Sequence, residues 1–216
     1  MKIKGHSRIE SIKLGYPIWT LVYNQSDQTM LADVREDKKQ KIEVWKVFLE
    51  GLKKKRIKIK MTWWEKLFGA QGEYAYAIRY EDKDDPSRYK LLQYNIKKGD
   101  SSVIEEQPII QNDILSPSLY DLDTAHHKTI ADFLGLELVT PCEYLELNRY
   151  IIISYYLRSE NGLDRFLLLL EGSEKRWKVK QDADMKGFAA GAFFVVKNQL
   201  LFVANRNEIC SYYLDT

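Results

Sequence analysis

Three histidines, His6, His126 and His127, are the residues best suited to bind a transition metal or to transfer a proton near neutral pH. A metal site on a helix needs a second ligand three or four residues along the chain, and neither His126 nor His127 has one at that spacing. Asp121 and Asp123 lie nearby, so a site of histidine and aspartate is the alternative. Packing and solvent exposure at a helix start account better for the histidine pair, and we predict no metal site.

Two cysteines, Cys142 and Cys210, are far apart in the sequence, and each has apolar neighbours. Neither belongs to a Cys-x-x-Cys pair, so their spacing does not indicate a zinc site. A free cysteine usually behaves as a small buried hydrophobic residue. We therefore predict two buried free thiols, with a disulfide or a reactive thiol as the alternative.

Two runs of charged residues could bind ions of opposite charge. The acidic run 81–85 lacks the ligand spacing and the central glycine of a calcium-binding loop, which favours a solvated hairpin tip. The basic run 53–60 could contact phosphate groups. Its second half alternates with isoleucine, so we interpret residues 56–61 as a half-buried strand with lysines on its exposed face.

The adjacent pair Trp63 and Trp64 offers two large aromatic surfaces for stacking on a ligand. Neighbouring residues of a strand point to opposite faces, so at most one of the two side chains would join a given core. Tryptophans in repeated β units usually contribute to packing. The outward one of the pair is nevertheless our candidate binding residue, and Trp63 and Trp64 together form the candidate site.

The sequence contains none of the local motifs that identify common enzymes. There is no Gly-x-Ser-x-Gly, no Gly-x-Gly-x-x-Gly, no Walker loop and no His-Glu-x-x-His. The stretch 187–191 has two glycines but is too apolar to hold a phosphate, and it is typical of a small-residue packing site. We therefore predict no catalytic residue and no cofactor.

Alternating apolar residues and polar turns predict many short strands and one helix. The helix is expected to begin after Asp123 or Thr124 and to stop at Gly135, with His126 on the same face as Ile130. Residues 107–122 carry weak signals and are expected to be irregular. The strands are expected at residues 18–22, 29–34, 42–48, 56–61, 74–80, 89–96, 102–105, 142–147, 150–157, 165–170, 177–180, 193–196, 199–203 and 209–214.

The apolar run, charged turn and second apolar run recur along the chain, beginning near residues 74, 150 and 193, with a looser copy near residue 18. Consecutive strands with short turns form antiparallel meanders, and repeated meanders with aromatic residues are typical of β-propeller blades. We predict a single all-β domain over residues 1–216 with blade-like, β-propeller-like repeats and one inserted helix. A β-sandwich is the alternative.

Several apolar stretches also resemble an uncharacterised family of Bacteroidetes proteins, which is catalogued as a domain of unknown function. The resemblance covers most of the chain and implies propeller-like β repeats with no assigned activity and no catalytic residues. It depends on Ile18-Trp19-Thr20-Leu21, Trp63-Trp64, Thr129-Ile130-Ala131-Asp132-Phe133, Pro141, Glu143-Tyr144-Leu145-Glu146, Ile151-Ile152-Ile153-Ser154-Tyr155-Tyr156 and Lys197-Asn198-Gln199-Leu200-Leu201-Phe202-Val203.

The 216 residues carry a formal net charge of +2, which gives no overall attraction to nucleic acid. No apolar stretch follows the basic residues at the N-terminus, and no apolar run is long enough to span a bilayer. These patterns predict a cytoplasmic binding or scaffold protein whose partner is a protein or a small molecule, without nucleic acid or membrane. A hydrolase or isomerase with its site in a propeller channel is the alternative.

Overall fold

The computed structural model describes residues 9–82, 84–172 and 174–215. In these residues the chain forms four antiparallel sheets and one α-helix, without a closed barrel or propeller. The prediction of an all-β class is confirmed, whereas the propeller-like form stays a prediction. The chain divides into two compact units: the first unit is Glu10–Asp113, and the second unit is Ile9 with residues 114–215.

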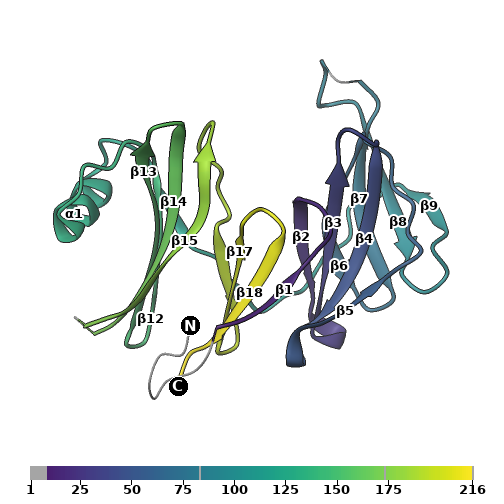
Figure 1. The fold of residues 1–216 in the computed structure, drawn as a ribbon. Coiled ribbons are helices and arrows are strands. Elements are labelled where there is room, and N and C mark those ends of the chain that lie inside the picture. The colour runs from purple at the N-terminus through teal and green to yellow at the C-terminus, as the bar shows by residue number, and fades with distance from the viewer. Residues whose placement is uncertain (1–8, 83, 173, 216) are drawn as a thin grey trace. The chain divides into compact units, whose positions relative to one another are not determined.

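The first unit contains two four-stranded meanders, in which each strand pairs with the next one along the chain (Figure 1). Short 3₁₀ turns, η1 (Gln25–Asp27) and η2 (Glu50–Leu52), join strands of the first meander. A separate short strand, β1 (Glu10–Lys13), comes before both meanders. The meanders are β2 (Ile18–Asn24), β3 (Thr29–Glu36), β4 (Lys41–Phe48) and β5 (Lys53–Arg56), followed by β6 (Glu65–Gln71), β7 (Tyr74–Tyr80), β8 (Tyr89–Asn95) and β9 (Ser101–Ile104).

The two meanders of the first unit share one hydrophobic core, because their alternating apolar residues face one another. Leu31 and Val44 come from the first sheet, and Leu67 and Leu92 come from the second. Asn24, fully buried at the end of β2, exchanges two hydrogen bonds with the backbone of Gly72, at 2.8 and 3.0 Å. This pairing ties the two meanders together at one end.

The segment 57–62 connects the two meanders and differs from the predicted strand. On this edge of β4, only β5 is paired as a strand: the backbone N–H of Ile57 still donates to the Val44 oxygen, at 3.0 Å, and residues 57–62 belong to no strand. The expected alternation is present: Ile59 and Met61 are buried, whereas Lys58 and Lys60 are exposed. The chain leaves the edge of β4 here because its apolar side chains enter the core between the sheets.

The second unit contains two further sheets and the helix α1 (Ala125–Leu134). One sheet has the order β11–β12–β13–β14–β15, and in the other β18, β17, β16 and β10 follow one another. The region 107–122, expected to be irregular, contributes two short strands, of which β10 pairs with the distant β16 and β11 pairs with β12 across the intervening helix. The strands are β10 (Ile114–Leu115), β11 (Ser118–Tyr120), β12 (Cys142–Leu147), β13 (Tyr150–Ser159), β14 (Gly162–Glu171), β15 (Glu174–Met185), β16 (Phe193–Val196), β17 (Gln199–Ala204) and β18 (Glu208–Tyr213).

Helix α1 begins and ends as the sequence predicts. The Thr124 side chain accepts a hydrogen bond from the backbone N–H of His127, at 3.2 Å, and Gly135 closes the helix in the left-handed conformation. The expected position of His126 on the buried face is wrong, because His127 and Ile130, three residues apart, occupy that face. Phe133, near the end of the helix, is 58% exposed.

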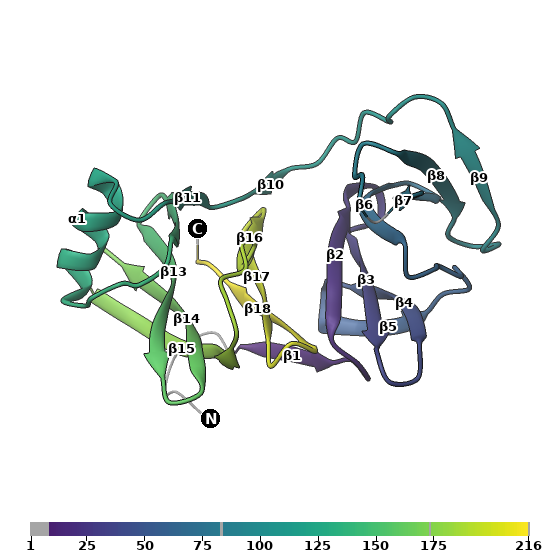
Figure 2. The same ribbon diagram turned by 90° about the horizontal axis from the view of Figure 1, so that it is seen from above.

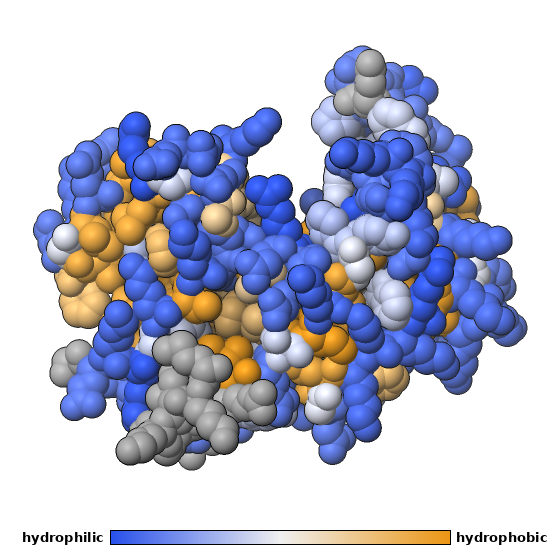
Figure 3. All heavy atoms as spheres, in the orientation of Figure 1, coloured by the Kyte–Doolittle hydropathy of each residue, from blue (hydrophilic) through white to orange (hydrophobic). Residues whose placement is uncertain are grey.

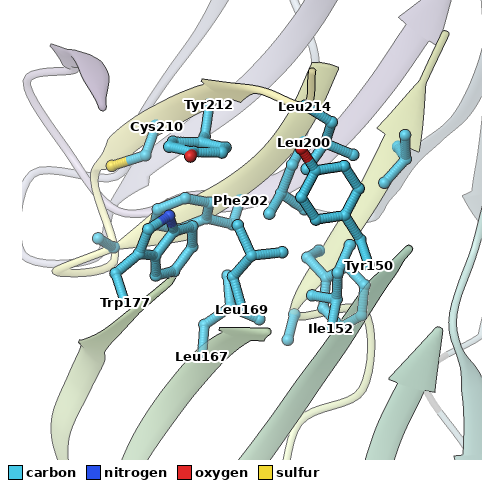
Figure 4. Packing of buried hydrophobic residues seen from close by; sticks show 14 residues of the cluster. Tyr150, Ile152, Leu167, Leu169, Trp177, Leu200, Phe202, Cys210, Tyr212 and Leu214 are labelled. Carbon is cyan, nitrogen blue, oxygen red and sulfur yellow. The ribbon is translucent and has the colours of Figure 1, made fainter. Parts of the chain in front are cut away.

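The sheet of β11 to β15 is covered on both faces, which accounts for its continuous apolar runs. Along β13 and β14, Ile152 and Leu167 face the sheet of β16 to β18, whereas Ile153 and Leu168 face α1 (Figure 2). Figure 4 shows the first of these cores, in which Trp177 lies against the aromatic rings of Phe202 and Tyr212. The second unit is therefore a three-layer arrangement of helix, sheet and sheet.

Candidate functional site

Three tryptophans of the first unit form a cluster that is partly open to solvent. Trp19, from β2, meets Trp63 edge to face, with ring centroids 5.6 Å apart, and Trp64 follows directly in the chain. Trp19 is 55% exposed and Trp64 is 53% exposed, whereas Trp63 is partly buried. We call Trp19, Trp63 and Trp64 the tryptophan cluster.

The guanidinium of Arg35 contacts two rings of the tryptophan cluster. Its guanidinium carbon lies 4.8 Å from the ring centroid of Trp19 and 5.3 Å from that of Trp63, within the range of cation–π attraction. The same guanidinium donates to both carboxylate oxygens of Asp33, at 2.7 to 3.1 Å, and to the backbone oxygens of Trp63 and Glu65. Burial raises the pKa of Asp33, and the hydrogen bonds and charge of Arg35 offset only part of that effect.

Glu65 fixes the turn that carries the two adjacent tryptophans. Its fully buried carboxylate accepts from Arg79 at 2.7 Å, from the Tyr94 hydroxyl at 2.6 Å and from the backbone N–H of Thr62 at 2.9 Å. The backbone N–H of Glu65 donates in return to the Thr62 oxygen, at 3.2 Å. Trp63 and Trp64 are therefore the two central residues of a tight turn, not neighbours on a strand as the sequence analysis expected. Burial, together with the bond to Glu65, raises the pKa of Tyr94.

A groove of about 1110 Å³ runs beside the turn, within the first unit, and is lined by residues 40–42, 56–64 and 98–100. Its lining contains five basic residues and a single acidic one, Asp100, so its charge is strongly positive. We call it the basic groove. The basic residues are Lys41, Arg56, Lys58, Lys60 and Lys98.

Two of these basic residues are positioned by a buried carboxylate. Glu43 pairs with Lys41 at 2.9 Å and with Arg56 at 3.2 Å, and it accepts a hydrogen bond from the indole of Trp45 at 3.1 Å. Burial alone would raise the pKa of Glu43, but its hydrogen bonds from Lys41 and Trp45 and the charge of Arg56 lower it below its usual value. The hydrogen bond with Glu43 in turn raises the pKa of Lys41.

The far side of the basic groove is the tight turn 97–100 between β8 and β9, which the sequence predicts. Gly99 there has φ +85°, and a Cβ at this position would lie 2.7 Å from the backbone oxygen of Lys58. Only glycine fits this conformation and this close approach without a shift. The contact between Gly99 and Lys58 holds the turn against the segment 57–62, and this sets the width of the basic groove.

Sequence reasoning identified Trp63, Trp64 and the basic run but missed Trp19, Arg35 and Glu65. A signal was present at Asp33 and Arg35, which are two residues apart and so share one face of an otherwise apolar strand. Nothing in the sequence indicates that this strand lies beside Trp63. The acidic hairpin, as expected, is a polar tip closed by side-chain bonds such as that from the backbone N–H of Asp84 to Asp82, at 3.0 Å; Lys83 lies outside the described residues.

The second unit contains a different polar cluster, which holds a loop. The buried carboxylate of Glu143 accepts from the backbone N–H groups of Gly191 at 2.5 Å and Ala192 at 3.0 Å. The Tyr156 hydroxyl donates to the backbone oxygen of Ala189 at 2.9 Å. Burial raises the pKa of Glu143, and its hydrogen bonds offset only part of that effect. The stretch 187–192 is therefore an anchored loop. The predicted small-residue packing site is wrong, because Gly187 and Gly191 are exposed and a Cβ at either position would meet no atom within 4 Å.

The other candidate residues of the sequence analysis are in the second unit. His127 is buried, with its Nε2 3.0 Å from the backbone oxygen of Thr140, and His126 stacks on Tyr120 at 4.8 Å. His6 lies outside the described residues. Among the residues that the structure describes, no group of three or more His, Cys, Asp or Glu could hold a metal ion.

Both cysteines are buried and free, as predicted. Burial raises the pKa of Cys142 to about 11 and that of Cys210 to about 12, so both stay protonated and unreactive near neutral pH.

Apolar side chains also reach the surface around α1, including Leu119, Leu122 and Phe133, in a region where hydrophobic residues show among hydrophilic ones (Figure 3).

Comparisons with protein-family models and with curated proteins give no match to this chain. The geometry of the first unit is therefore the basis for any functional conclusion.

Proposed function

We propose that this protein is a non-catalytic binding or scaffold protein whose contact surface combines the tryptophan cluster and the basic groove of the first unit. One observation carries the proposal: Trp19 and Trp64 are about half exposed and are held beside a groove that is rich in lysine. Large aromatic residues contribute much of the binding energy at protein contact surfaces. Basic side chains around them favour an anionic partner.

The rigidity of the cluster supports the same proposal. Arg35 is fixed by four acceptors, and the turn from Thr62 to Glu65 is closed by bonds in both directions. A contact surface that is already ordered loses less conformational entropy when a partner binds. Exposed tryptophans held in this way are better suited to binding than to packing.

We also propose a cytoplasmic location, because Cys142 and Cys210 are free thiols of the kind that a reducing compartment maintains. The four sheets would be blade-like repeats related to the uncharacterised family that the sequence resembles. The partner would be a protein or a small molecule, since the near-neutral net charge gives no overall attraction to nucleic acid.

In the described residues, the one α-helix is too short and too polar to cross a membrane.

Fluorine NMR of protein labelled with 5-fluorotryptophan tests the proposed contact surface. The chain has five tryptophans, so each signal is assigned by a single Trp→Phe substitution. Polyphosphate and poly-L-glutamate serve as anionic probes. We expect the signals of Trp19, Trp63 and Trp64 to shift, while that of Trp177, in the core of the second unit, stays in place. If neither probe moves the three signals of the cluster, the proposal is wrong.

Stability measurements separate binding from packing within the cluster. Trp64→Ala is expected to change the free energy of unfolding by less than about 0.5 kcal/mol, as for most surface positions. Trp63→Ala is expected to cost about 3 kcal/mol, the lower end of the usual range for truncating a large buried aromatic residue. Equal, large losses for both variants in urea denaturation would remove Trp64 from the contact surface.

A further inference from the structure

The extended segment 57–62 presents a regular row of groups along the basic groove. Its side chains alternate, with Ile59 and Met61 in the core and Lys58 and Lys60 facing outward. Six extended residues span about 20 Å at roughly 3.3 Å per residue. A ligand that uses the whole row must therefore be long, and an extended peptide of similar length has the matching repeat.

The charges of this row are available to a ligand. Within the described residues, no ion pair is formed by Lys58, Lys60 or Lys98, whereas Lys41 and Arg56 are held by Glu43. The groove thus combines two basic groups in fixed positions with three that form no ion pair within the described residues. An acidic ligand would neutralise them, and a basic or neutral one would not.

The strand that leads into the row has a free edge. β5 is the last strand of its sheet and pairs only with β4, and all four of its residues are exposed. Its sequence is Lys53-Lys54-Lys55-Arg56, and such lysines at a sheet edge prevent pairing with a second copy of the same edge. The charges that repel an identical strand attract an acidic one.

We propose that the basic groove binds an extended, acidic segment of a partner protein, which adds a strand at the edge of β5 and places its carboxylates on Lys58, Lys60 and Lys98. This inference rests on the proposed function of the first unit as a binding module. Strand addition is a common way of recognising peptides, in which main-chain hydrogen bonds give affinity and alternate side chains give specificity. The exposed ring of Trp64, at the end of the row, would cover an apolar residue of the same segment.

A protein segment fits these observations better than the other anionic ligands. A nucleic-acid backbone has acceptors for N–H groups but lacks the alternating donors and acceptors that pair with a strand edge, and a small anion would use only part of an open groove of about 1110 Å³. An acidic peptide uses the edge, the row of lysines and the neighbouring aromatic ring together.

The test measures binding of capped, dye-labelled peptides to the full chain by fluorescence anisotropy. The first peptide alternates Glu and Thr over about eight residues, and the second has Lys in place of Glu. The third keeps the acidic sequence but is N-methylated at alternate residues, so that its pairing edge cannot donate hydrogen bonds. We expect the first to bind, the second not to bind, and the third to bind at least about tenfold more weakly.

Charge reversal in the protein tests the position. The double substitution Lys58→Glu and Lys60→Glu is expected to raise the Kd of the acidic peptide about tenfold or more, since each exposed pair contributes a few-fold. The matched control Lys128→Glu and Lys175→Glu changes the net charge equally, at exposed positions of the second unit, and should alter the Kd by less than about twofold. Lys98→Glu alone is the second variant, in case the double one does not fold.

Three outcomes would overturn the inference. Equal affinity for the N-methylated and unmodified peptides would mean attraction by charge without strand addition. Binding of an oligothymidylate or of polyphosphate, without binding of the acidic peptide, would contradict the partner class but would leave the proposed contact surface standing. If no anion binds and no tryptophan signal shifts, both the inference and the proposed function are wrong.

Discussion

The two units bury carboxylates in different ways. In the first unit, Glu43 and Glu65 face basic side chains that are themselves about half exposed, such as Arg56 and Arg79. In the second unit, Glu143 accepts hydrogen bonds from backbone N–H groups of the loop 187–192, and the charge of Arg165 also acts on it. Arg165 is buried with its partner Asp182, as Arg35 is with Asp33 in the first unit.

This difference shows what each cluster can do. A buried acid whose partner reaches the surface holds that basic group in place, where a ligand could meet it. A buried acid whose partners are backbone groups holds the chain itself. The pKa directions of two of these acids also differ, because Glu43 has a lowered pKa and Glu143 a raised one. The first arrangement suits a binding surface, and the second suits an internal anchor.

The largest loss of unfolding free energy is expected from removing Arg35. Removing Arg165 in the same way tests whether the two buried ion pairs contribute equally. Arg35→Leu leaves Asp33 and two backbone oxygens without their donor, and removing one partner of a buried pair typically costs about 3–5 kcal/mol. Arg165→Leu should cost less, because Asp182 keeps a hydrogen bond from the backbone N–H of Arg206, at 2.9 Å. Urea denaturation gives both values.

Equal losses for the two arginine variants would show that the extra bonds of Arg35 contribute nothing. Lys180→Ala, which breaks an exposed pair with Asp164, is the control and should cost less than about 1 kcal/mol.

A smaller effect is expected at the anchor of the second unit. Glu143→Ala leaves the N–H groups of Gly191 and Ala192 without an acceptor, which should lower the free energy of unfolding by about 1–3 kcal/mol. Hydrogen exchange at these two amides should become faster as the loop is released. Glu146→Ala, on the exposed end of the same strand, is the matched control. Unchanged exchange at both amides would contradict the anchoring role.

The smallest effect concerns pH and has opposite signs for Glu43 and Glu143. The unfolded pKa of a glutamate is about 4.3. Glu43 has a lowered folded pKa, so its contribution to stability is present above about pH 4.3 and is lost as the pH falls through its folded value. Glu143 has a raised folded pKa, so its contribution decreases as the pH rises from about 4.3 through its folded value.

The measurement is the free energy of unfolding between roughly pH 3 and 7 for the unsubstituted protein, Glu43→Gln and Glu143→Gln. For each variant, its free energy of unfolding is subtracted from that of the unsubstituted protein and plotted against pH. The two curves should slope in opposite directions, by at most about 1.4 kcal/mol per pH unit. Slopes of the same sign would remove the distinction between the two kinds of buried acid.

Much of the strand order is predictable because hairpins depend on local signals. The turn at Asn161 and Gly162, between two apolar runs, gives the pairing of β13 with β14, and Thr124 and Gly135 mark the ends of α1. The short strands β10 and β11 are not predictable in this way, since β10 pairs with β16, about 80 residues later, and β11 pairs with β12 only after the intervening helix.

Only the residue types of the candidate site are predictable, because its arrangement depends on contacts between residues that are far apart in the sequence. Trp63 and Trp64 stand out by residue type, but their position in a turn depends on Glu65 and on Arg35, which comes 28 residues before Trp63. Trp19 joins the cluster only because β2 lies beside that turn. Sequence alone therefore identifies which residues could bind and leaves their arrangement open.

The sheet that is covered on both faces has a consequence for the order of folding during synthesis. Helix α1 precedes β12 to β15 in the chain, so the residues that cover Ile153 and Leu168 have already been synthesised when these strands leave the ribosome. The opposite face, with Ile152 and Leu167, remains uncovered until β16 to β18 have been synthesised. Until those strands are made, the nascent chain exposes one apolar sheet face, and this is where a chaperone would bind.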